Sequence, residues 1–449
     1  MTEDADADRT DTDDSVAVPV REIAPLNTEE RRAIFERDAG VESVRDDARE
    51  IVERVRTEGD VALRELAEEI EGVTVGNVEI TDEAERAYER LDDDVRAAIE
   101  TAIGNVRAFH EAQLPTDWRR EFEGRELGRR FAPIERVGAY VPGGTAAYPS
   151  SAIMTVVPAR VAGVETVVAA TPPAEDQPDA TLAALHAAGA DRIVAAGGAQ
   201  AVAALAYGTE SVPRTQLVVG PGNEWVTAAK GIVRGDVEID FEAGPSEVLV
   251  VADDTADPEY VAADVVAQAE HDSAASTACV THDRETAESV AERIGTLAAD
   301  SERAETIAAA LDGPGSGVFL ARSASEATLF AEAYAPEHLA IQTADPEAVL
   351  DRVPSAGSAF LGPYSPVAAG DYATGTNHVL PTNGAAAVVS GLSVETFLRS
   401  TTVQRLDRAA LSDLRGALAT LARTEGLPAH AASIDRRFGD DGPRSDGEE

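Results

Sequence analysis

The sequence feature that most constrains the fold is a series of short apolar runs that recur at regular intervals from Arg136 onward. Glycine or proline ends each run, and an alanine-rich stretch with helical periodicity follows it. Strands that alternate with helices in this way are typical of βα units, which form a mostly parallel sheet with helices on both faces. The first four runs occupy residues 137–140, 166–170, 192–196 and 216–220.

A second series of apolar runs follows the first. Two series indicate two α/β domains of similar construction, which fits an ancient duplication even though no residue-level repeat is visible. We therefore predict an α/β protein with two incomplete Rossmann-like domains, each built on a parallel sheet, and with helical N-terminal and C-terminal extensions. The runs of the second series occupy residues 247–252, 276–281, 317–321, 338–342 and 358–361.

The domain boundaries follow the changes of texture along the chain. We assign residues 18–135 together with 246–384 to the first α/β domain, which includes the N-terminal helices. Residues 136–245 form the second α/β domain, and residues 385–437 are predicted to be a C-terminal helical extension.

Both ends of the sequence are acidic. Residues 1–17 and 438–449 lack regular apolar spacing, so we predict that both are disordered acidic tails. Asn27 is followed three residues later by Glu30, which is the pattern of a capping box and predicts that a helix begins there.

The chain carries a formal net charge of −44, and Lys230 is its single lysine. A field of this sign repels phosphate backbones, which argues against nucleic acid as a partner. Salt at about 1 M shortens the screening length to about 3 Å and removes most of the self-repulsion. We hypothesise that the protein works in a salt-rich cytoplasm.

Membrane-spanning and disulfide-bonded classes are not expected. No apolar run approaches the roughly 20 residues that span a bilayer, and the chain does not open with a basic-then-apolar signal pattern. We therefore expect a cytoplasmic protein without a membrane partner. The one cysteine, Cys279, lies in an apolar run and is predicted to be a buried core thiol and not a nucleophile.

Glycine-rich segments follow three of the first four apolar runs, at residues 141–145, 197–200 and 220–223. In open parallel sheets, ligands bind beyond the carboxyl ends of the strands. Glycines there let backbone N–H groups approach an anion at a helix N-terminus. None of the segments is a full G-x-G-x-x-G motif, because Trp225 occupies the place of the third glycine in the last one. Tight βα turns without a ligand are the alternative.

A carboxylate and an imidazole lie side by side at Glu337 and His338, directly after Pro336. Proline fixes its own φ and moves the preceding residue away from helical geometry, so we expect a bend that leads into the run 338–341. Neighbouring residues of an extended chain point in opposite directions, and the two groups would then serve two sides of one site. An exposed polar dipeptide is the alternative.

A possible metal-ligand set comes from residues far apart in the sequence. Gln268 and His271 share one helix face at i,i+3 spacing. Asp371 and His378 bracket a glycine-rich loop, and His430 lies near the C-terminus. The amide, the carboxylate and the imidazoles of His271 and His430 form an N/O set suited to zinc. Composition alone leaves this metal site open.

Several of these segments are parts of long motifs, and together they resemble the histidinol dehydrogenase family. The motifs are DFEAGPSEVLV at 240–250, QAEH at 268–271, APEHL at 335–339 and GDYATGTNHVLPT at 370–382. The resemblance covers about residues 23–434. It implies a zinc-dependent enzyme of the last steps of histidine biosynthesis. Such an enzyme oxidises L-histidinol to L-histidine through histidinaldehyde, in two hydride transfers to two NAD.

The resemblance also implies roles for single positions. Glu337 and His338 match the catalytic pair. Gln268, His271, Asp371 and His430 match the ligands of one zinc ion per subunit, and His430 would come from the partner subunit of a homodimer. Ser246, His378 and Glu425 match positions that hold the substrate, which also contacts His338 and the four metal ligands. Tyr140, Gln200 and Asn223 match the positions that line NAD.

The chemistry of these groups fits the implied roles. A neutral imidazole such as His338 suits removal of a hydroxyl proton near pH 7, and Glu337 can draw a proton from the water that adds to the aldehyde. The substrate's own imidazole and amine bind zinc, so zinc would mainly orient it. Because the loops lack the full fingerprint, we expect loose NAD binding. A zinc hydrolase and a non-catalytic two-lobed binding protein are the alternatives.

Overall fold

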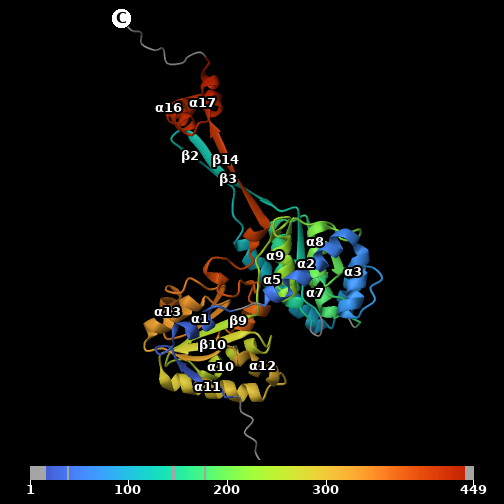
Figure 1. Ribbon diagram of the computed structural model, residues 1–449, viewed down its shortest axis with the longest axis vertical. Coiled ribbons are helices and arrows are strands. Elements are labelled where there is room, and N and C mark those ends of the chain that lie inside the picture. Colours follow the sequence, from blue (N-terminus) through green and yellow to red (C-terminus); the bar gives the residue numbers. More distant parts are fainter. Residues whose placement is uncertain (1–16, 38–39, 144–146, 176–177, 440–449) are drawn as a thin grey trace, which may run out of the picture. The chain divides into compact units, whose positions relative to one another are not determined.

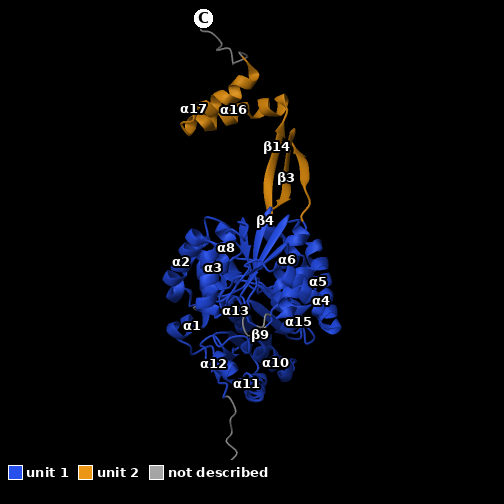
Figure 2. Ribbon diagram, turned by 90° about the vertical axis from the view of Figure 1, so that its right-hand side faces the viewer, with its two compact units in different colours: residues 1–114, 134–397 blue, residues 115–133, 398–449 orange. Residues whose placement is uncertain are grey.

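The computed structural model describes residues 17–37, 40–143, 147–175 and 178–439. It divides into two compact units (Figure 2). Unit 1 contains residues 1–114 and 134–397, and unit 2 contains residues 115–133 and 398–449. The predicted acidic tails lie outside the described residues, apart from residue 17 and residues 438–439.

The first series of apolar runs forms a five-stranded parallel sheet in unit 1 with the order β6-β5-β4-β7-β8. Helices cover both faces of this sheet (Figure 1), so its valines and alanines are almost fully buried and show no period-two pattern. The strands are β4 (Arg136–Tyr140), β5 (Thr166–Thr171), β6 (Arg192–Ala195), β7 (Leu217–Val219) and β8 (Glu238–Ile239). The helices of this half are α6 (Pro149–Ala162), α7 (Asp179–Ala188), α8 (Gly198–Tyr207) and α9 (Glu224–Val233).

The second series forms a six-stranded parallel sheet with the order β1-β11-β10-β9-β12-β13, also in unit 1. Its strands are β1 (Val20–Glu22), β9 (Glu247–Ala252), β10 (Ser276–Thr281), β11 (Gly317–Leu320), β12 (His338–Gln342) and β13 (Ser358–Leu361). The accompanying helices are α10 (Pro258–Ala269), α11 (Arg284–Ala299), α12 (Ala304–Leu311), α13 (Ala324–Tyr334), α14 (Pro346–Leu350) and α15 (Val367–Tyr372). Cys279 is buried in β10, as predicted.

The two sheets share one strand order once the edge strand β1 is set aside. In each, the chain runs outward from a central strand on one side and then returns to the other side, so the order reverses between β4 and β7 and between β9 and β12. This is the Rossmann order without its sixth strand. The predicted α/β class with two incomplete Rossmann-like sheets is confirmed, and the shared order supports a duplication.

The N-terminal helices are distributed differently from the predicted domain boundaries. Ala48, Val52 and Val55 of α2 are buried in the same core as the five-stranded sheet. The predicted boundaries had instead assigned α2 to the domain of the six-stranded sheet. Amphipathic periodicity shows which face of a helix is buried but not which sheet covers it. Helix α1, with its predicted Asn27–Glu30 capping box, does pack in the core of the six-stranded sheet, as the predicted boundaries require. These helices are α1 (Thr28–Phe35), α2 (Val41–Glu58), α3 (Asp60–Leu66), α4 (Thr81–Arg90) and α5 (Asp93–Ala112).

Unit 2 is not only helical, as had been predicted for residues 385–437. Its antiparallel sheet consists of β2 (Trp118–Phe122), β3 (Arg125–Pro133) and β14 (Leu398–Leu406), followed by α16 (Arg408–Thr424) and α17 (Pro428–Asp435). Both faces of β2 are exposed, so its charged sequence carries no alternating apolar signal. Phe438, assigned to the acidic tail, is buried and ends a 3-10 turn. Within the described ranges, no helix is long and apolar enough to cross a membrane.

Candidate active site

Glu337 and His338 lie where the chain enters β12. Helix α13 ends at Tyr334, Ala335 adopts a left-handed conformation with φ 45°, and the strand begins at His338. The predicted bend is therefore present. Both residues are buried, with 6% and 3% of their surface exposed, so the pair is not an exposed polar dipeptide.

Glu247, the first residue of the neighbouring strand β9, contacts both members of the pair. Its backbone N–H donates to Glu337 Oε2 at 2.8 Å, and its own Oε2 accepts from the Glu337 backbone N–H at 3.3 Å. The Arg37 guanidinium holds the Glu247 carboxylate with bonds of 2.6 and 3.1 Å. Burial raises the pKa of Glu247 to about 7, against the opposing charge of Arg37. Glu337 and His338 are thus attached to the buried ion pair of Glu247 and Arg37, which no sequence pattern predicts.

The surroundings of His338 determine which of its nitrogens is available. Nδ1 lies 3.0 Å from the Glu247 backbone oxygen. A carbonyl oxygen only accepts, so Nδ1 carries the proton and the neutral ring presents a free lone pair at Nε2. Nε2 is buried, has no hydrogen-bond partner among the described residues, and lies 3.4 Å from Asp371 Oδ1. Burial lowers the pKa of His338, but the carboxylates of Glu337 and Asp371 outweigh it and raise that pKa well above its usual value.

Asp371, at the end of α15, connects His338 to His378. The Asp371 backbone oxygen accepts from His378 Nδ1 at 2.8 Å, and His378 Nε2 lies 3.2 Å from the hydroxyl of Ser151 on α6. Burial lowers the pKa of His378, which favours a neutral ring. Burial raises the pKa of Asp371, yet His338 beside it lowers that pKa overall. Ser151 is a further member of this cluster that no sequence pattern indicates, since it lies in an apolar helical stretch.

The three predicted metal ligands of unit 1 lie in or next to helices α10 and α15, which pack against each other. His271, just past the end of α10, is near enough to Asp371 to help lower the pKa of that carboxylate. Gln268, buried on α10, accepts the His271 backbone N–H at its own backbone oxygen, so the two residues form one turn. No cluster of three His, Cys, Asp or Glu side chains suited to a metal occurs among the described residues. The amide and carboxylate oxygens and the imidazole fit a zinc ion that takes its remaining ligands elsewhere.

The other predicted residues of this site lie on different segments. Ser246 directly precedes β9 and is half-buried. Glu425 caps the C-terminus of α16, and His430 lies in α17. Both belong to unit 2 and both are exposed, whereas Asp371 and His271 belong to unit 1.

The predicted cofactor residues lie at the carboxyl ends of the five-stranded sheet. Tyr140 ends β4 and its hydroxyl accepts the Gly198 backbone N–H at 3.3 Å. Gln200 is buried in α8, and its Nε2 donates to Glu71 Oε1 at 2.8 Å. The Asn223 side chain caps α9 by accepting the Val226 N–H at 3.2 Å.

A buried ion pair fixes the loop before Asn223. The single lysine, Lys230, is fully buried and pairs with Asp240. Lys230 Nζ donates to the Gly220 backbone oxygen at 3.0 Å, and Asp240 Oδ2 accepts the Gly220 N–H at 2.8 Å. Gly220 has a φ of 120°, and a Cβ there would lie 2.0 Å from the Tyr140 backbone oxygen. Only glycine fits, because the loop passes directly against the backbone of β4. Gly144 and Thr145 of the first loop lie outside the described residues.

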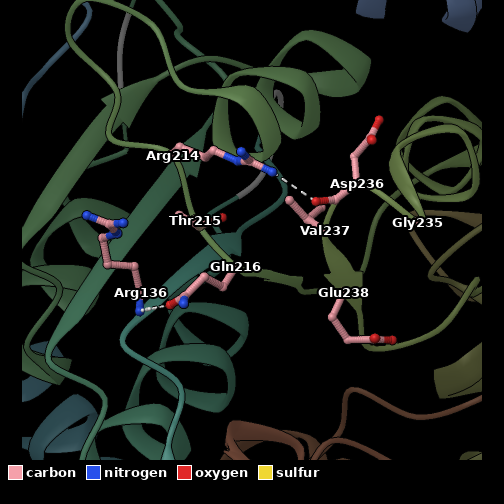
Figure 3. A pocket seen from close by; sticks show the side chains of 8 residues that line it. All are labelled: Arg136, Arg214, Thr215, Gln216, Gly235, Asp236, Val237 and Glu238. Atoms are coloured by element: carbon pink, nitrogen blue, oxygen red, sulfur yellow. Dashed lines mark hydrogen bonds between the residues drawn. The ribbon is translucent and has the colours of Figure 1, made fainter.

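A pocket of about 420 Å³ lies instead at the opposite, amino-terminal edge of the same sheet (Figure 3). Its walls are polar, and their groups are already bonded to one another. Arg214 donates to the Asp236 backbone oxygen at 3.0 Å, and the Arg136 N–H donates to Gln216 Oε1 at 2.9 Å. It contains none of the predicted site residues.

Comparisons with known proteins agree on one family. The family model described as histidinol dehydrogenase matches residues 35–438. The histidinol dehydrogenase of Haloarcula marismortui is 65% identical over 93% of this chain and 99% of its own length. That of Halobacterium salinarum is 64% identical over 93% of this chain and 99% of its own. The crystal structure of histidinol dehydrogenase from Elizabethkingia anophelis has a TM-score of 0.89 and 32% identity, and covers 94% of this chain and 98% of its own.

Proposed function

This chain belongs to the histidinol dehydrogenase family, and from that premise we propose that it oxidises L-histidinol to L-histidine through histidinaldehyde, in two hydride transfers to two NAD. The observation that carries the proposal is the buried His338, whose Nδ1 is held by the Glu247 backbone oxygen while Nε2 has no described hydrogen-bond partner. In its neutral form this ring presents Nε2 to a hydroxyl group and can accept its proton, and the two carboxylates that raise the pKa of His338 then hold that proton.

In the first half-reaction, His338 Nε2 takes the hydroxyl proton as hydride leaves the carbinol carbon. NAD, when bound, accepts that hydride. The Glu247 backbone oxygen keeps the imidazole in one tautomer and orientation throughout. The neighbouring carboxylates of Glu337 and Asp371 stabilise the imidazolium that forms, because they already raise the pKa of this ring.

In the second half-reaction, Glu337 takes a proton from the water that adds to the aldehyde. Its Oε2 is held by the Glu247 N–H at 2.8 Å, which fixes the carboxylate beside His338. The buried position also excludes bulk water from the aldehyde until the attacking water is in place. The two neighbouring side chains therefore divide the two oxidations between them.

Zinc is the metal that the donor set suits, with Gln268, His271 and Asp371 of one subunit and His430 of the partner subunit as its ligands. Zinc, when bound, orients the imidazole and amine of histidinol. Ser246, His378 and Glu425 complete the substrate contacts, and the exposure of Glu425 and His430 supports their donation to a second subunit of a homodimer. A His430→Ala variant with full zinc content by elemental analysis would remove His430 from this set.

Charge supports the choice of substrate and surroundings. Asp371 and Glu425 suit a cationic amino alcohol, and the net charge of −44 fits the salt-rich cytoplasm in which we place the protein, as do its haloarchaeal relatives. Tyr140, Gln200 and Asn223 are the residues that we assign to NAD.

The division of labour between Glu337 and His338 is tested by separating the two half-reactions. Glu337→Gln should slow oxidation of supplied histidinaldehyde by about 100-fold or more while slowing alcohol oxidation much less, since only the former needs activated water. Single-turnover formation of NADH from each substrate measures this. Equal slowing of both steps would refute Glu337 as the group that activates water.

A further inference from the structure

Glu71 lies at the cofactor end of the five-stranded sheet, although it comes from a segment far from the glycine-rich loops. It is the last residue of the π-helical turn Ala67–Glu71, which follows α3, and α3 packs against α8. Its Oε1 accepts from Gln200 Nε2 at 2.8 Å. A Cβ at Gly197, the residue before α8, would lie only 2.5 Å from the same oxygen. The carboxylate therefore touches both the loop after β6 and a residue assigned to NAD.

The second oxygen of this carboxylate is buried and has no hydrogen-bond partner among the described residues. Its environment disfavours the charged form, since burial raises the pKa of Glu71 to about 7. A buried acceptor without a donor costs free energy, and such groups are rare unless a ligand or water supplies the donor. The bond from Gln200 accounts for Oε1 only, so Oε2 is the atom that lacks a donor.

The position of Glu71 in the sheet order indicates what the donor is. In a Rossmann sheet, a carboxylate near the end of the second strand binds the ribose hydroxyls of a dinucleotide. Here the second strand is β5, and Pro172 follows it directly. A Cβ at Gly197 would meet Pro172 Cβ at 2.9 Å as well as Glu71, and a Cβ at Gly143 would meet Pro172 Cδ at 2.9 Å. Glu71 comes from another part of the chain, but its carboxylate lies near the end of the second strand, where the ribose-binding acid of a Rossmann sheet is found.

We propose that Glu71 binds the adenosine ribose hydroxyls of the dinucleotide and selects NAD against NADP. A free ribose offers two hydroxyl donors to the unpartnered oxygen. A 2′-phosphate offers none and brings negative charge towards a carboxylate. The inference deepens the proposed function and rests on NAD being the oxidant.

Binding of the nonreactive fragment ADP-ribose, and of its 2′-phosphate, tests Glu71 without relying on activity. Calorimetry in molar KCl at a pH above 7, where the Glu71 carboxyl is ionised, should show that Glu71→Gln weakens ADP-ribose about 10- to 100-fold, the value of hydrogen bonds to a charged group. The 2′-phosphate should bind Glu71→Gln no more weakly than it binds the unmodified protein. Glu68→Gln is the matched control, because Glu68 is exposed on the same turn and the substitution removes the same charge. It should leave both affinities unchanged.

Kinetics then gives the selectivity directly. The ratio of kcat/KM for NAD to that for NADP should fall at least about tenfold in Glu71→Gln, with kcat at saturating NAD retained. Glu71→Asp keeps the charge but shortens the side chain by one methylene, so it should weaken ADP-ribose while still rejecting NADP, and it provides the test if the glutamine variant does not fold. An unchanged ratio in Glu71→Gln, an unchanged affinity of Glu71→Asp for ADP-ribose, or an equal change in Glu68→Gln overturns the role of Glu71. Failure of the unmodified protein to reduce NAD with histidinol overturns the proposed function instead.

Discussion

The five-stranded and six-stranded sheets share one strand order, yet they carry their candidate site groups at opposite ends. In the five-stranded sheet, Tyr140 and the loop 220–223 follow the carboxyl ends of β4 and β7. In the six-stranded sheet, Glu247 and His338 are the first residues of β9 and β12, at the amino ends. The rule that ligands bind beyond the carboxyl ends therefore describes the first sheet and not the second.

The two ends also differ in whether backbone groups or side chains form the candidate site. At the five-stranded sheet backbone groups form the candidate site. Lys230 bonds to the backbone oxygen of Gly220, and Asp240 bonds to its N–H. At the six-stranded sheet buried side chains form the candidate site, and Glu247, paired with Arg37, contacts both Glu337 and His338. Strand order thus specifies where a crevice can form, while glycine or charge at the strand ends decides whether it suits an anionic cofactor or proton transfer.

The largest loss of activity should come from a substitution at the amino end of the six-stranded sheet, where side chains form the candidate site. His338→Asn removes the base at Nε2, and turnover of histidinol should fall by about 10²- to 10⁴-fold. The fold, measured by circular dichroism, should be retained. His282→Asn is the matched control, because His282 is exposed just after β10. Turnover within a few-fold of the unmodified protein in His338→Asn would contradict the assignment.

At the carboxyl end of the five-stranded sheet, where backbone groups form the candidate site, stability should be most sensitive to an added side chain. In Gly220→Ala, the Cβ would lie 2.0 Å from the Tyr140 oxygen at a φ of 120°, so we expect a loss of about 3 kcal/mol or more in the free energy of unfolding and a higher KM for NAD. Chemical unfolding at fixed KCl measures the first. In contrast, Gly104→Ala should stabilise by up to about 1 kcal/mol, because Gly104 lies in helix α5 with open space around it. Equal tolerance of both substitutions would refute the requirement for glycine at 220.

Each sheet has one carboxylate whose pKa burial raises to about 7, Glu247 in one and Glu71 in the other. The folded state then binds more protons than the unfolded state between about pH 4.5 and 7, so the contribution of each group to stability falls as pH rises through that window. For Glu247, this contribution to the free energy of unfolding should fall by about 3 kcal/mol across that window. The loss for Glu71 is smaller because solvent screens it.

Unfolding free energies measured at several pH values test this comparison. Glu247→Gln should flatten the dependence between pH 5 and 7 more than Glu71→Gln does. Identical slopes in the unmodified protein and in Glu247→Gln would show that the Glu247 carboxyl titrates normally.

The smallest effect concerns salt. NAD is anionic and histidinol is cationic, so screening of the net charge of −44 should act on them in opposite directions. Between low and molar KCl, KM for NAD should fall and KM for histidinol should rise, each by about two- to tenfold. The melting temperature should rise over the same range. A melting temperature independent of KCl would contradict adaptation to a salt-rich cytoplasm.

Much of the fold follows from local pattern, whereas the supports of the site do not. The apolar runs mark nearly every parallel strand of both sheets, and Pro336 marks the bend before His338. By contrast, Arg37 lies 210 residues from its partner Glu247 and is one of 38 basic residues, so no spacing pairs them. Glu71 and Ser151 lie in ordinary helical stretches and acquire significance only from what packs against them. The charged strands β2 and β3 were not predicted, because neither has a clear apolar alternation.

The central claim is that one buried pair, Glu337 and His338, carries a chain of this family through two successive oxidations with NAD. The most direct measurement is the amount of NADH formed per histidine from limiting L-histidinol in molar KCl, with the protein loaded with zinc. The account predicts two NADH for each histidine and no accumulation of free histidinaldehyde. One NADH with released aldehyde, or no NADH at all, would contradict it.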